Sequence, residues 1–475
     1  MPDRPSSLTP QSLIRRGRTR SRTAAQAAHR VRDFLRTQNG VTAVETGPAP
    51  GGDRVLATVW VEDTPCGLPR RTLPDGTPLY ELNGYETDYL YQEIFQDRVY
   101  APVGLRMPAR PVILDIGANI GVCSLFLTRA HPGATVYAFE PSPDAFTALA
   151  ANVLALGLPV VALPWAVGGA AGTAAMTVYP GATVYSGLHA EDAADHAAIS
   201  AAIDTAVDTG TRAGTQVAGE LAGERMRGAR TAGVTVIALR DVLDRLGGAD
   251  VDLLKLDAEG AEADILGSLV ARDWSRIRQI IMEVHRESEV ANLVALLTDA
   301  GYDCAVETVS ALRGTGYHNV LAVRRDSAVP QPPRGTAVTP AAGAPALVTV
   351  VPPGPHDRLR QALDDFLGAD DPPVELETRR GTPATPATGA APVPSRPADP
   401  EVLAVIVAAC SDVLGTPVAA GDDFFAAGGT SLTAVRLLAR VRERLGGALG
   451  LADLMEDPTP AGLAARATTT PRPRP

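Results

Sequence analysis

Cysteine, basic charge and long apolar stretches are all scarce in this sequence of 475 residues. The four cysteines are scattered without a CxxC pair, which speaks against a disulfide framework or a zinc site and fits a reducing cytoplasm. Lysine and arginine total 43 against 54 acidic residues, so we expect no nucleic-acid partner, because phosphate binding needs a basic surface. Glycine and proline interrupt the uncharged runs, and the basic N-terminus lacks an apolar stretch. We therefore expect a cytoplasmic protein with neither a membrane helix nor a secretory signal.

Glycine and proline are abundant instead, at 45 and 40 residues, whereas aromatic residues make up only 4%. At roughly 100–200 residues per domain, the length predicts about two to four domains. Prolines concentrate at 329–346 and 379–398, a composition that favours extended linkers over a packed core. Near the N-terminus, five arginines lie between Arg15 and Arg22. A solvated leader is the simpler interpretation of this arm, and a local anion-binding tail is the alternative.

The middle of the chain alternates strand-like and helix-like patterns. The predicted strands are 112–116, 135–139, 159–163, 251–256 and 279–284, and the predicted helices are 122–130, 143–155, 261–269 and 290–300. This alternation predicts a doubly wound α/β fold with a parallel sheet and helices on both faces. The Ala-rich segment Glu191–Gly233 interrupts the pattern, either as a lid or substrate-docking insert or as a passive surface insert.

Asp115 lies at the end of the first predicted strand, and a glycine turn with Gly117, Asn119 and Gly121 follows it. Glycine permits a tight turn and close approach of a ligand, and the next helix points its free amides there. Glu140 directly follows the second predicted strand, where a carboxylate can accept hydrogen bonds from both hydroxyls of a ribose. Because Asn119 replaces the second glycine of GxGxxG and Asp115 repels phosphate, the pattern favours a cationic nucleoside such as S-adenosylmethionine. An ordinary turn between strand and helix is the alternative.

These residues, with Phe139-Glu140-Pro141 and the run KLDAEGAE at 255–262, resemble FkbM-type S-adenosylmethionine-dependent methyltransferases. The stretches Asn83–Tyr100 and Tyr179–Leu188 resemble the versions attached to nonribosomal peptide and polyketide synthases. The resemblance covers roughly residues 73–323. It implies a Rossmann-like class I methyltransferase sheet and O-methylation of a natural-product intermediate. It also implies cofactor contacts from six residues: Asp115, Gly117, Asn119, Gly121, Glu140 and Pro141.

Methyl transfer to an alcohol needs a base within hydrogen-bond reach, and ligands of doubly wound sheets bind at the carboxyl ends of the strands. Four catalytic candidates follow two of the predicted strands there: Asp257, Glu259, Glu283 and His285. Tyr185 lies in a preceding loop. Glu262 either joins the site or caps its helix or forms a pair there. A lone histidine is often a structural residue, which is the alternative for His285. The acidic run suits a sulfonium or a metal ion, but no neighbouring histidine completes a ligand set, so no metal is expected.

The C-terminal region carries a third motif, DDFFAAGGTSL at 422–432. A helix is predicted over Leu432–Leu445, which puts Ser431 at the N-cap position. The motif resembles that of peptidyl carrier proteins, small all-α domains of four helices, and implies 4′-phosphopantetheine covalently attached to Ser431. Capping alone is the alternative for this serine. Ala427 and Thr430 depart from the family pattern, which bears on the choice of partner enzymes.

Two flanking segments, 31–72 and 347–378, resemble the halves of the small C-terminal subdomain of adenylation domains, without the adenylation core and with no lysine after Lys255. Two unrelated segments are the alternative. The expected order is therefore a basic arm (1–30), a first half-subdomain (31–72), the methyltransferase (73–328), a linker (329–346), the second half (347–378), a linker (379–398) and the carrier (399–470).

Together these features predict a methyltransferase that methylates an oxygen of an aminoacyl or peptidyl group. This group is tethered to a carrier in nonribosomal peptide or hybrid biosynthesis. N-methylation of a carrier-bound amino acid is one alternative. A non-catalytic carrier and docking protein with an inactive methyltransferase is the other. The expected partners are a phosphopantetheinyl transferase, adenylation or other synthetase enzymes that load the carrier, and an acyl thioester.

Overall fold

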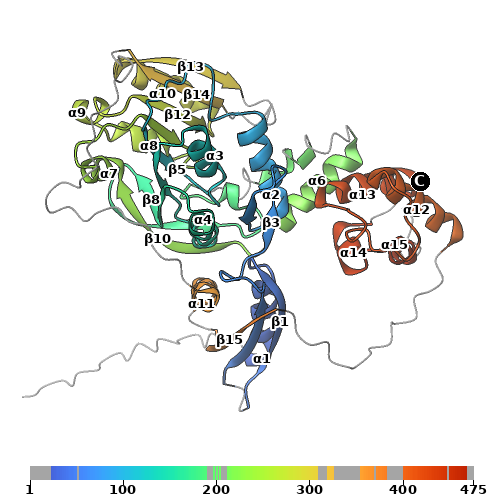
Figure 1. Cartoon of the computed structure of the whole chain (residues 1–475). Helices are drawn as coiled ribbons and strands as arrows, with labels where there is room; N and C mark the ends of the chain where they lie inside the picture. The colour runs from blue at the N-terminus through green and yellow to red at the C-terminus, as the bar shows by residue number, and fades with distance from the viewer. Residues whose placement is uncertain are drawn as a thin grey trace, which may run out of the picture.

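The computed structural model describes residues 23–50, 53–189, 211–308, 318–325, 354–368, 371–381, 399–446 and 449–467, with parts of 196–204. The arginine cluster at Arg15–Arg22, the linker 329–346 and most of the linker 379–398 lie outside these residues. Figure 1 shows a large α/β unit, a small sheet below it and a helical C-terminal region beside it. None of the described helices is long and apolar enough to cross a membrane.

The large unit is built on a sheet of seven strands in the order β13-β14-β12-β11-β5-β6-β7. The strands are β5 (Val112–Ile116), β6 (Thr135–Phe139), β7 (Val160–Leu163), β11 (Leu253–Leu256), β12 (Gln279–Val284), β13 (Tyr302–Thr308) and β14 (His318–Arg324). β14 runs antiparallel to both of its neighbours, whereas the pairs from β12 to β7 are parallel. The central strands are buried along their whole length, as their continuous apolar sequences predict.

Helices cover both faces of this sheet (Figure 1). They are α3 (Val122–Ala130), α4 (Pro143–Leu156), α7 (Leu239–Arg245), α8 (Glu262–Gly267), α9 (Ala271–Trp274) and α10 (Glu287–Asp299). Successive residues of a strand point to opposite faces of the sheet. Ile113 packs with α3 and α4 on one face, and Leu114 packs with α7, α8 and α10 on the other. The predicted doubly wound fold is therefore confirmed.

Short elements and an insertion surround the carboxyl ends of the strands. Upstream lie β3 (Arg70–Thr72), β4 (Pro78–Tyr80), α2 (Gly84–Tyr91) and the π-helix η1 (Gln92–Gln96). After β7 come β8 (Trp165–Gly168), β9 (Gly172–Val178), the 3₁₀ turn η2 (Thr183–Tyr185), α6 (Arg212–Arg225) and β10 (Arg230–Ala238). β10 pairs with both β8 and β9 in a second sheet. The interrupting segment 191–233 is thus partly helical, as expected, but its end already belongs to a strand.

Segments from the two flanks of the large unit share the small sheet. The first flank supplies α1 (Ala24–Arg36), β1 (Val41–Pro48) and β2 (Val55–Val61), and the second supplies α11 (Pro355–Phe366) and β15 (Val374–Arg380). β15 lies parallel to β2, and the rings of Phe34 and Phe366 stack 4.0 Å apart. The two flanking segments therefore form one unit, although its likeness to an adenylation subdomain stays a prediction.

A buried ion network joins this small unit to the large one. The Asp144 carboxylate of α4 lies 2.7 Å from a guanidinium nitrogen of Arg358 and 3.4 Å from one of Arg230, and Arg230 also pairs with Asp365 at 3.1 Å. Burial alone would raise the pKa of Asp144, but the two arginines outweigh it and lower the pKa. The charges compensate one another, so removal of one partner would leave a buried unpaired charge.

The C-terminal region contains α12 (Pro400–Leu414), α13 (Ser431–Leu445), α14 (Leu451–Glu456) and α15 (Pro460–Ala467). The predicted four-helix domain is present, and it packs through α13 against α6 of the insertion (Figure 1). One detail of the prediction was wrong. Thr430, not Ser431, is the N-cap of α13, since its hydroxyl accepts the backbone N–H of Thr433, and Ser431 is the first residue of the helix.

Candidate active site

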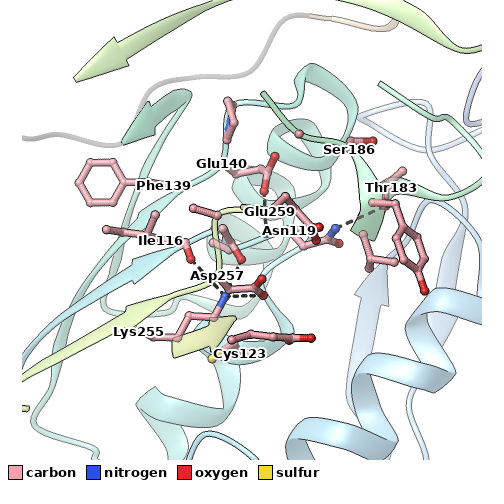
Figure 2. A pocket seen from close by; sticks show the side chains of 18 of the residues that line it. Ile116, Asn119, Cys123, Phe139, Glu140, Thr183, Ser186, Lys255, Asp257 and Glu259 are labelled. Atoms are coloured by element: carbon pink, nitrogen blue, oxygen red, sulfur yellow. Dashed lines mark hydrogen bonds and ion pairs between the residues drawn. The ribbon is translucent and has the colours of Figure 1, made fainter. Parts of the chain in front are cut away.

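A cavity opens at the carboxyl ends of β5, β6, β11 and β12, where the sequence predicts the ligand (Figure 2). Its volume is about 1120 Å³, open solvent at the mouth included. Eight of the ten predicted site residues of the methyltransferase line it: Gly117, Asn119, Glu140, Pro141, Asp257, Glu259, Glu283 and His285.

The glycine turn after β5 is fixed by its neighbours. Gly117 has a φ of +75°, and a Cβ there would lie 1.8 Å from the carbonyl oxygen of Asp257, so no other residue fits. Gly121, with a φ of +91°, begins α3 against Leu149 and does not line the cavity. This second glycine therefore serves the turn and the packing of α3.

Asp115 does not lie where we expected it. It is fully buried behind the cavity wall, where one oxygen accepts a hydrogen bond from the Ser124 hydroxyl at 2.6 Å. Its other oxygen is 3.5 Å from the ammonium of Lys255. The physical reason is the register of the sheet, which puts Lys255 of β11 directly beside Asp115 of β5. In this structure the carboxylate orients Lys255 and is out of reach of a ligand in the cavity.

Glu140 is held by the backbone at the other side of the turn. One carboxylate oxygen accepts the N–H of Asn119 at 2.8 Å and the other accepts the N–H of Ser142 at 2.7 Å. Each oxygen keeps a second lone pair for a ligand hydroxyl. Burial raises the pKa of Glu140 to about 7 in spite of these hydrogen bonds.

A chain of hydrogen bonds ties the turn to the segment before the sheet. The Asn119 side-chain amide donates to Thr183 at 3.4 Å, and the Thr183 hydroxyl donates to Glu86 of α2 at 2.6 Å. Asn119 has a φ of +47°, a left-handed conformation that asparagine tolerates better than most residues. Asn83–Tyr100 and Tyr179–Leu188, quoted for their resemblance, thus supply one wall of the cavity, including Tyr185.

Lys255 is the residue that sequence reasoning missed. Its ammonium donates to the carbonyl oxygens of Gly117 at 2.7 Å and Ile116 at 3.2 Å, and to Asp257 at 3.2 Å (Figure 2). Burial alone would lower the pKa of Lys255, but Asp257 and Asp115 outweigh it and raise the pKa above its usual value. The sequence does contain a sign of this role: a single lysine in the otherwise apolar strand LLKL and a single carboxylate in the otherwise apolar strand VILDI. A buried charge of this kind needs a partner of opposite charge.

The loop after β11 and the end of β12 bring His285 among three carboxylates. Its Nδ1 lies 3.2 Å from Glu262, and its Nε2 lies 3.3 Å from Glu259 and 3.6 Å from Asp257. The same Glu262 oxygen accepts the N–H groups of Ala258 and Gly260, so this carboxylate fixes both the loop and the histidine. Burial alone would lower the pKa of His285, but Glu259 and Glu262 raise it well above its usual value.

Glu283 completes the acidic side of the cavity. It is the next-to-last residue of β12, with 7% of its surface exposed. Burial, followed by the negative charge of Asp257, raises its pKa to about 8. Asp257 accepts a hydrogen bond from the Tyr100 hydroxyl, with an oxygen–oxygen distance of 3.3 Å. The four catalytic candidates therefore line one cavity.

Two family models match the chain. The methyltransferase FkbM domain matches residues 115–304, and the phosphopantetheine attachment site matches residues 404–467, which include Ser431. The first match covers the four strand ends that form the cavity, and the second covers the helical C-terminal region.

Curated relatives match parts of the chain. The 31-O-demethyl-FK506 methyltransferase FkbM of Streptomyces tacrolimicus is 37% identical over 53% of this chain and 95% of its own length. The AMB antimetabolite synthetase AmbE of Pseudomonas aeruginosa is 30% identical over 60% of this chain but only 14% of its own length. A dimodular nonribosomal peptide synthase of Bacillus subtilis is 52% identical over 12% of this chain and 2% of its own length.

The doubly wound sheet, the cavity at its strand ends and these matches agree with one another. The chain belongs to the FkbM family of S-adenosylmethionine-dependent methyltransferases, with the α/β sheet of class I methyltransferases and a C-terminal phosphopantetheine carrier domain.

Proposed function

We propose that this chain transfers a methyl group from S-adenosylmethionine to a hydroxyl of an acyl group that its own carrier domain holds as a thioester. The observation that carries the proposal is the contact between α13 of the carrier and α6 of the methyltransferase insertion. The name of the Streptomyces relative gives an oxygen as the methylated atom, and the names of the other two relatives give synthetases, which supports an oxygen acceptor in nonribosomal peptide or hybrid biosynthesis.

The carrier and the insertion share one apolar cluster. Val217 and Leu221 of α6 are buried together with Leu438 and Val441 of α13. At the edge of the cluster, Arg442 donates to Glu220 at 2.6 Å. We therefore assign the insertion as the carrier dock, which favours the first of its two predicted roles.

The dock lies next to the cavity. Tyr185 lines the cavity and also packs against the cluster that α6 and α13 share. Ser431 starts α13, where the free amides of the first turn favour an anionic group such as a phosphodiester. We propose that phosphopantetheine on Ser431 reaches into the cavity past this edge.

The cofactor is proposed to occupy the β5–β6 side of the cavity. There Glu140 would accept the two ribose hydroxyls, with Gly117, Asn119 and Pro141 around the nucleoside. The sulfonium would then face the carboxylates at the end of β11. A cation is favoured there because several buried carboxylates share that space.

The reaction is an in-line displacement. A lone pair of the acceptor oxygen forms the new O–CH₃ bond while the S–CH₃ bond breaks, and its electron pair goes to sulfur, which leaves S-adenosylhomocysteine. The hydroxyl proton passes to a basic atom of the cluster, for which Asp257, Glu259, Glu283 and His285 remain the candidates. The protein contributes mainly by holding both reactants in line and excluding water.

Intact-protein mass spectrometry tests the proposal. Ser431 would be loaded with a panel of hydroxyl-bearing acyl groups from their coenzyme A thioesters by a phosphopantetheinyl transferase, and then incubated with trideuteromethyl cofactor. We expect one labelled methyl on the acyl chain of at least one member and none on a Ser431→Ala chain. Fragmentation that places the label on nitrogen, or no label while cofactor binding is intact, would refute the proposal.

A further inference from the structure

The acidic side of the cavity holds more negative charge than its cations balance. Five carboxylates line the cavity, those of Glu93, Glu140, Asp257, Glu259 and Glu283. The cationic side chains in the lining are Lys255 and His285, and the Lys255 ammonium already contacts two backbone carbonyls and Asp257. Buried carboxylates in excess favour a bound cation or protonation. A sulfonium supplies only one positive charge at this side.

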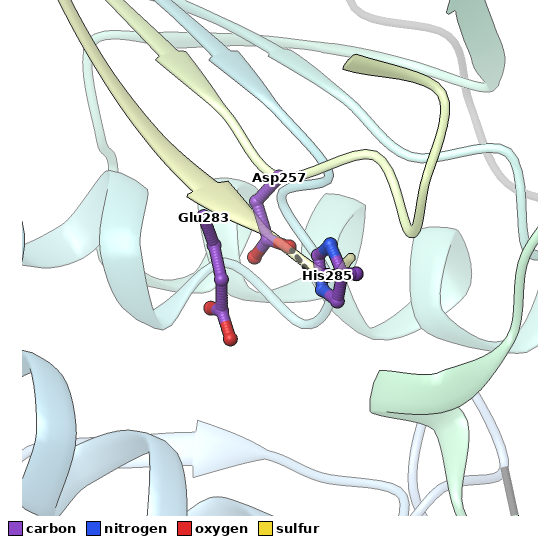
Figure 3. Close-up of side chains that lie close together, drawn as sticks. All are labelled: Asp257, Glu283 and His285. Atoms are coloured by element: carbon purple, nitrogen blue, oxygen red, sulfur yellow. Dashed lines mark ion pairs between the residues drawn. The ribbon is translucent and has the colours of Figure 1, made fainter. Parts of the chain in front are cut away.

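Three side chains converge as a ligand set at the ends of two neighbouring parallel strands. Asp257 follows β11, Glu283 is the next-to-last residue of β12, and His285 follows β12 (Figure 3). One oxygen or nitrogen from each of the three lies within 4.8 Å of the others. Two ligand atoms that each lie about 2.1 Å from an ion, on opposite sides of it, are about 4.2 Å apart. Small side-chain rotations would therefore bring the three ligand atoms to binding distance of one ion.

The hydrogen bond behind His285 orients this residue as a ligand. Glu262, fully buried and fixed by two backbone N–H groups, lies 3.2 Å from Nδ1. A proton on Nδ1 puts the lone pair of a neutral ring on Nε2, the atom that faces Asp257 and Glu259. A carboxylate behind a histidine is the usual support for a metal-binding imidazole.

Glu283 provides a second, independent observation. It is 7% exposed and lines the cavity, and among the described residues its carboxylate shows no hydrogen bond or close salt bridge, although the positive charges of His285 and Lys255 act on it. A buried carboxylate without a hydrogen-bond partner is costly to retain. One ligand atom of Glu283 lies within 4.8 Å of those of Asp257 and His285, so a cation shared by the three would offset that cost.

We propose that Asp257, Glu283 and His285 bind one divalent cation of the Mn²⁺ class at the acceptor side of the cavity. Two carboxylates with one imidazole suit Mn²⁺, which accepts oxygen and nitrogen ligands together, better than Ca²⁺. The expectation of no metal rested on the lack of a neighbouring histidine in the sequence, whereas the fold supplies His285. The role of the ion rests on the proposed function: it would hold the acceptor hydroxyl and acidify it.

Binding of Mn²⁺ alone tests the site without any methyl transfer. The full chain would be stripped with a chelator and titrated with Mn²⁺, and the bound ion followed by electron paramagnetic resonance. We expect one ion per chain, with binding at least tenfold weaker in Glu283→Gln and His285→Gln. Glu287→Gln, an exposed acidic position on α10, is the matched control and should bind like the wild type.

The outcomes separate this proposal from the proposed function. Calorimetry with S-adenosylmethionine on the same metal-free samples reports whether the cofactor side and the fold are intact. No Mn²⁺ binding by a chain that still binds the cofactor overturns the metal site alone. Equal Mn²⁺ binding by wild type, Glu283→Gln and His285→Gln also overturns it. Mn²⁺ binding with no methylation of any loaded acyl group leaves the metal site and contradicts the proposed acceptor.

Discussion

The two sides of the cavity are built on different principles. On the cofactor side, both oxygens of Glu140 accept backbone N–H groups, and the turn that holds it tolerates only glycine at Gly117. On the acceptor side, Asp257, Glu259 and Glu283 crowd around one histidine, and burial raises the pKa of Glu283 to about 8. The first side is complete without a ligand, whereas the second lacks compensating charge.

This difference indicates what each side does. A site whose polar groups are already satisfied and rigid binds a ligand without reorganisation, which suits a cofactor common to many reactions. A site with uncompensated carboxylates has groups available to take up a proton or a cation during the reaction. We therefore expect substitutions on the two sides to affect different kinetic parameters, and the following experiments test that separation.

The largest effect is expected from the acceptor side. Glu283→Gln and His285→Gln should each lower kcat for methyl transfer by about 10²–10⁴-fold, because each removes a group that takes up the proton or positions the acceptor. The Kd for S-adenosylmethionine should stay within about threefold. Single-turnover rates and calorimetry on the same samples measure the two quantities. A parallel rise in Kd would show that the two sides are not separate.

A second experiment breaks the cofactor side. Glu140→Gln should raise the Kd for S-adenosylmethionine by about a hundredfold, since hydrogen bonds to a charged acceptor contribute roughly 1.5–3 kcal/mol each. At saturating cofactor, kcat should fall far less than in Glu283→Gln. The exposed substitution Glu287→Gln controls for loss of one acidic residue. Unchanged cofactor affinity in Glu140→Gln would contradict the proposal that Glu140 binds the ribose hydroxyls.

The pH dependence of cofactor binding sharpens the comparison. The pKa of Glu140 is raised to about 7, mainly by burial, while Lys255 lowers it and Asp257 raises it. The ionised carboxylate is the better acceptor of ribose hydroxyls, so affinity should be full above pH 7 and fall by up to about tenfold per unit below it. Calorimetry between pH 5.5 and about 8.5 measures this. In Glu140→Gln the change of cofactor affinity with pH should disappear. A pH dependence that persists in this variant would show that another group is responsible for it.

The smallest effect is expected at the carrier dock. Glu220→Arg places two cations together at the rim of the α6–α13 contact and should slow methylation of the tethered acyl group by roughly five- to tenfold. Cofactor affinity should not change, because the pair lies outside the cavity lining. The double variant Glu220→Arg/Arg442→Glu restores opposite charges and should recover much of the rate. A single variant as fast as the wild type would argue against the dock.

Much of the fold could be predicted from the sequence, because buried parallel strands and glycine turns leave strong local patterns. Four predicted elements agree with the structure at both ends: 112–116, 122–130, 135–139 and 279–284. The N-cap of α13 was misplaced by one residue, since Thr430 and Ser431 both have a hydroxyl that can cap and the sequence does not say which one does.

The site was less predictable, because it depends on which strands are neighbours. Asp115 looked like a ligand contact until the register with Lys255 showed it to be a buried ion-pair partner. His285 looked isolated because Glu262 and Asp257 precede it by more than twenty residues, yet they meet it where β11 and β12 lie side by side. The carrier dock on α6 depends on contacts across more than two hundred residues of sequence.

The central claim, delivery of the acyl group by the chain's own carrier, predicts a rate that does not depend on concentration. The measurement is the initial rate of labelled methyl incorporation per acyl-loaded chain, at saturating cofactor, over a hundredfold dilution of the protein. Transfer within one chain predicts a constant rate per chain, because the tether fixes the effective concentration. A rate per chain that falls in proportion to dilution would contradict the claim and place the carrier of one chain at the cavity of another.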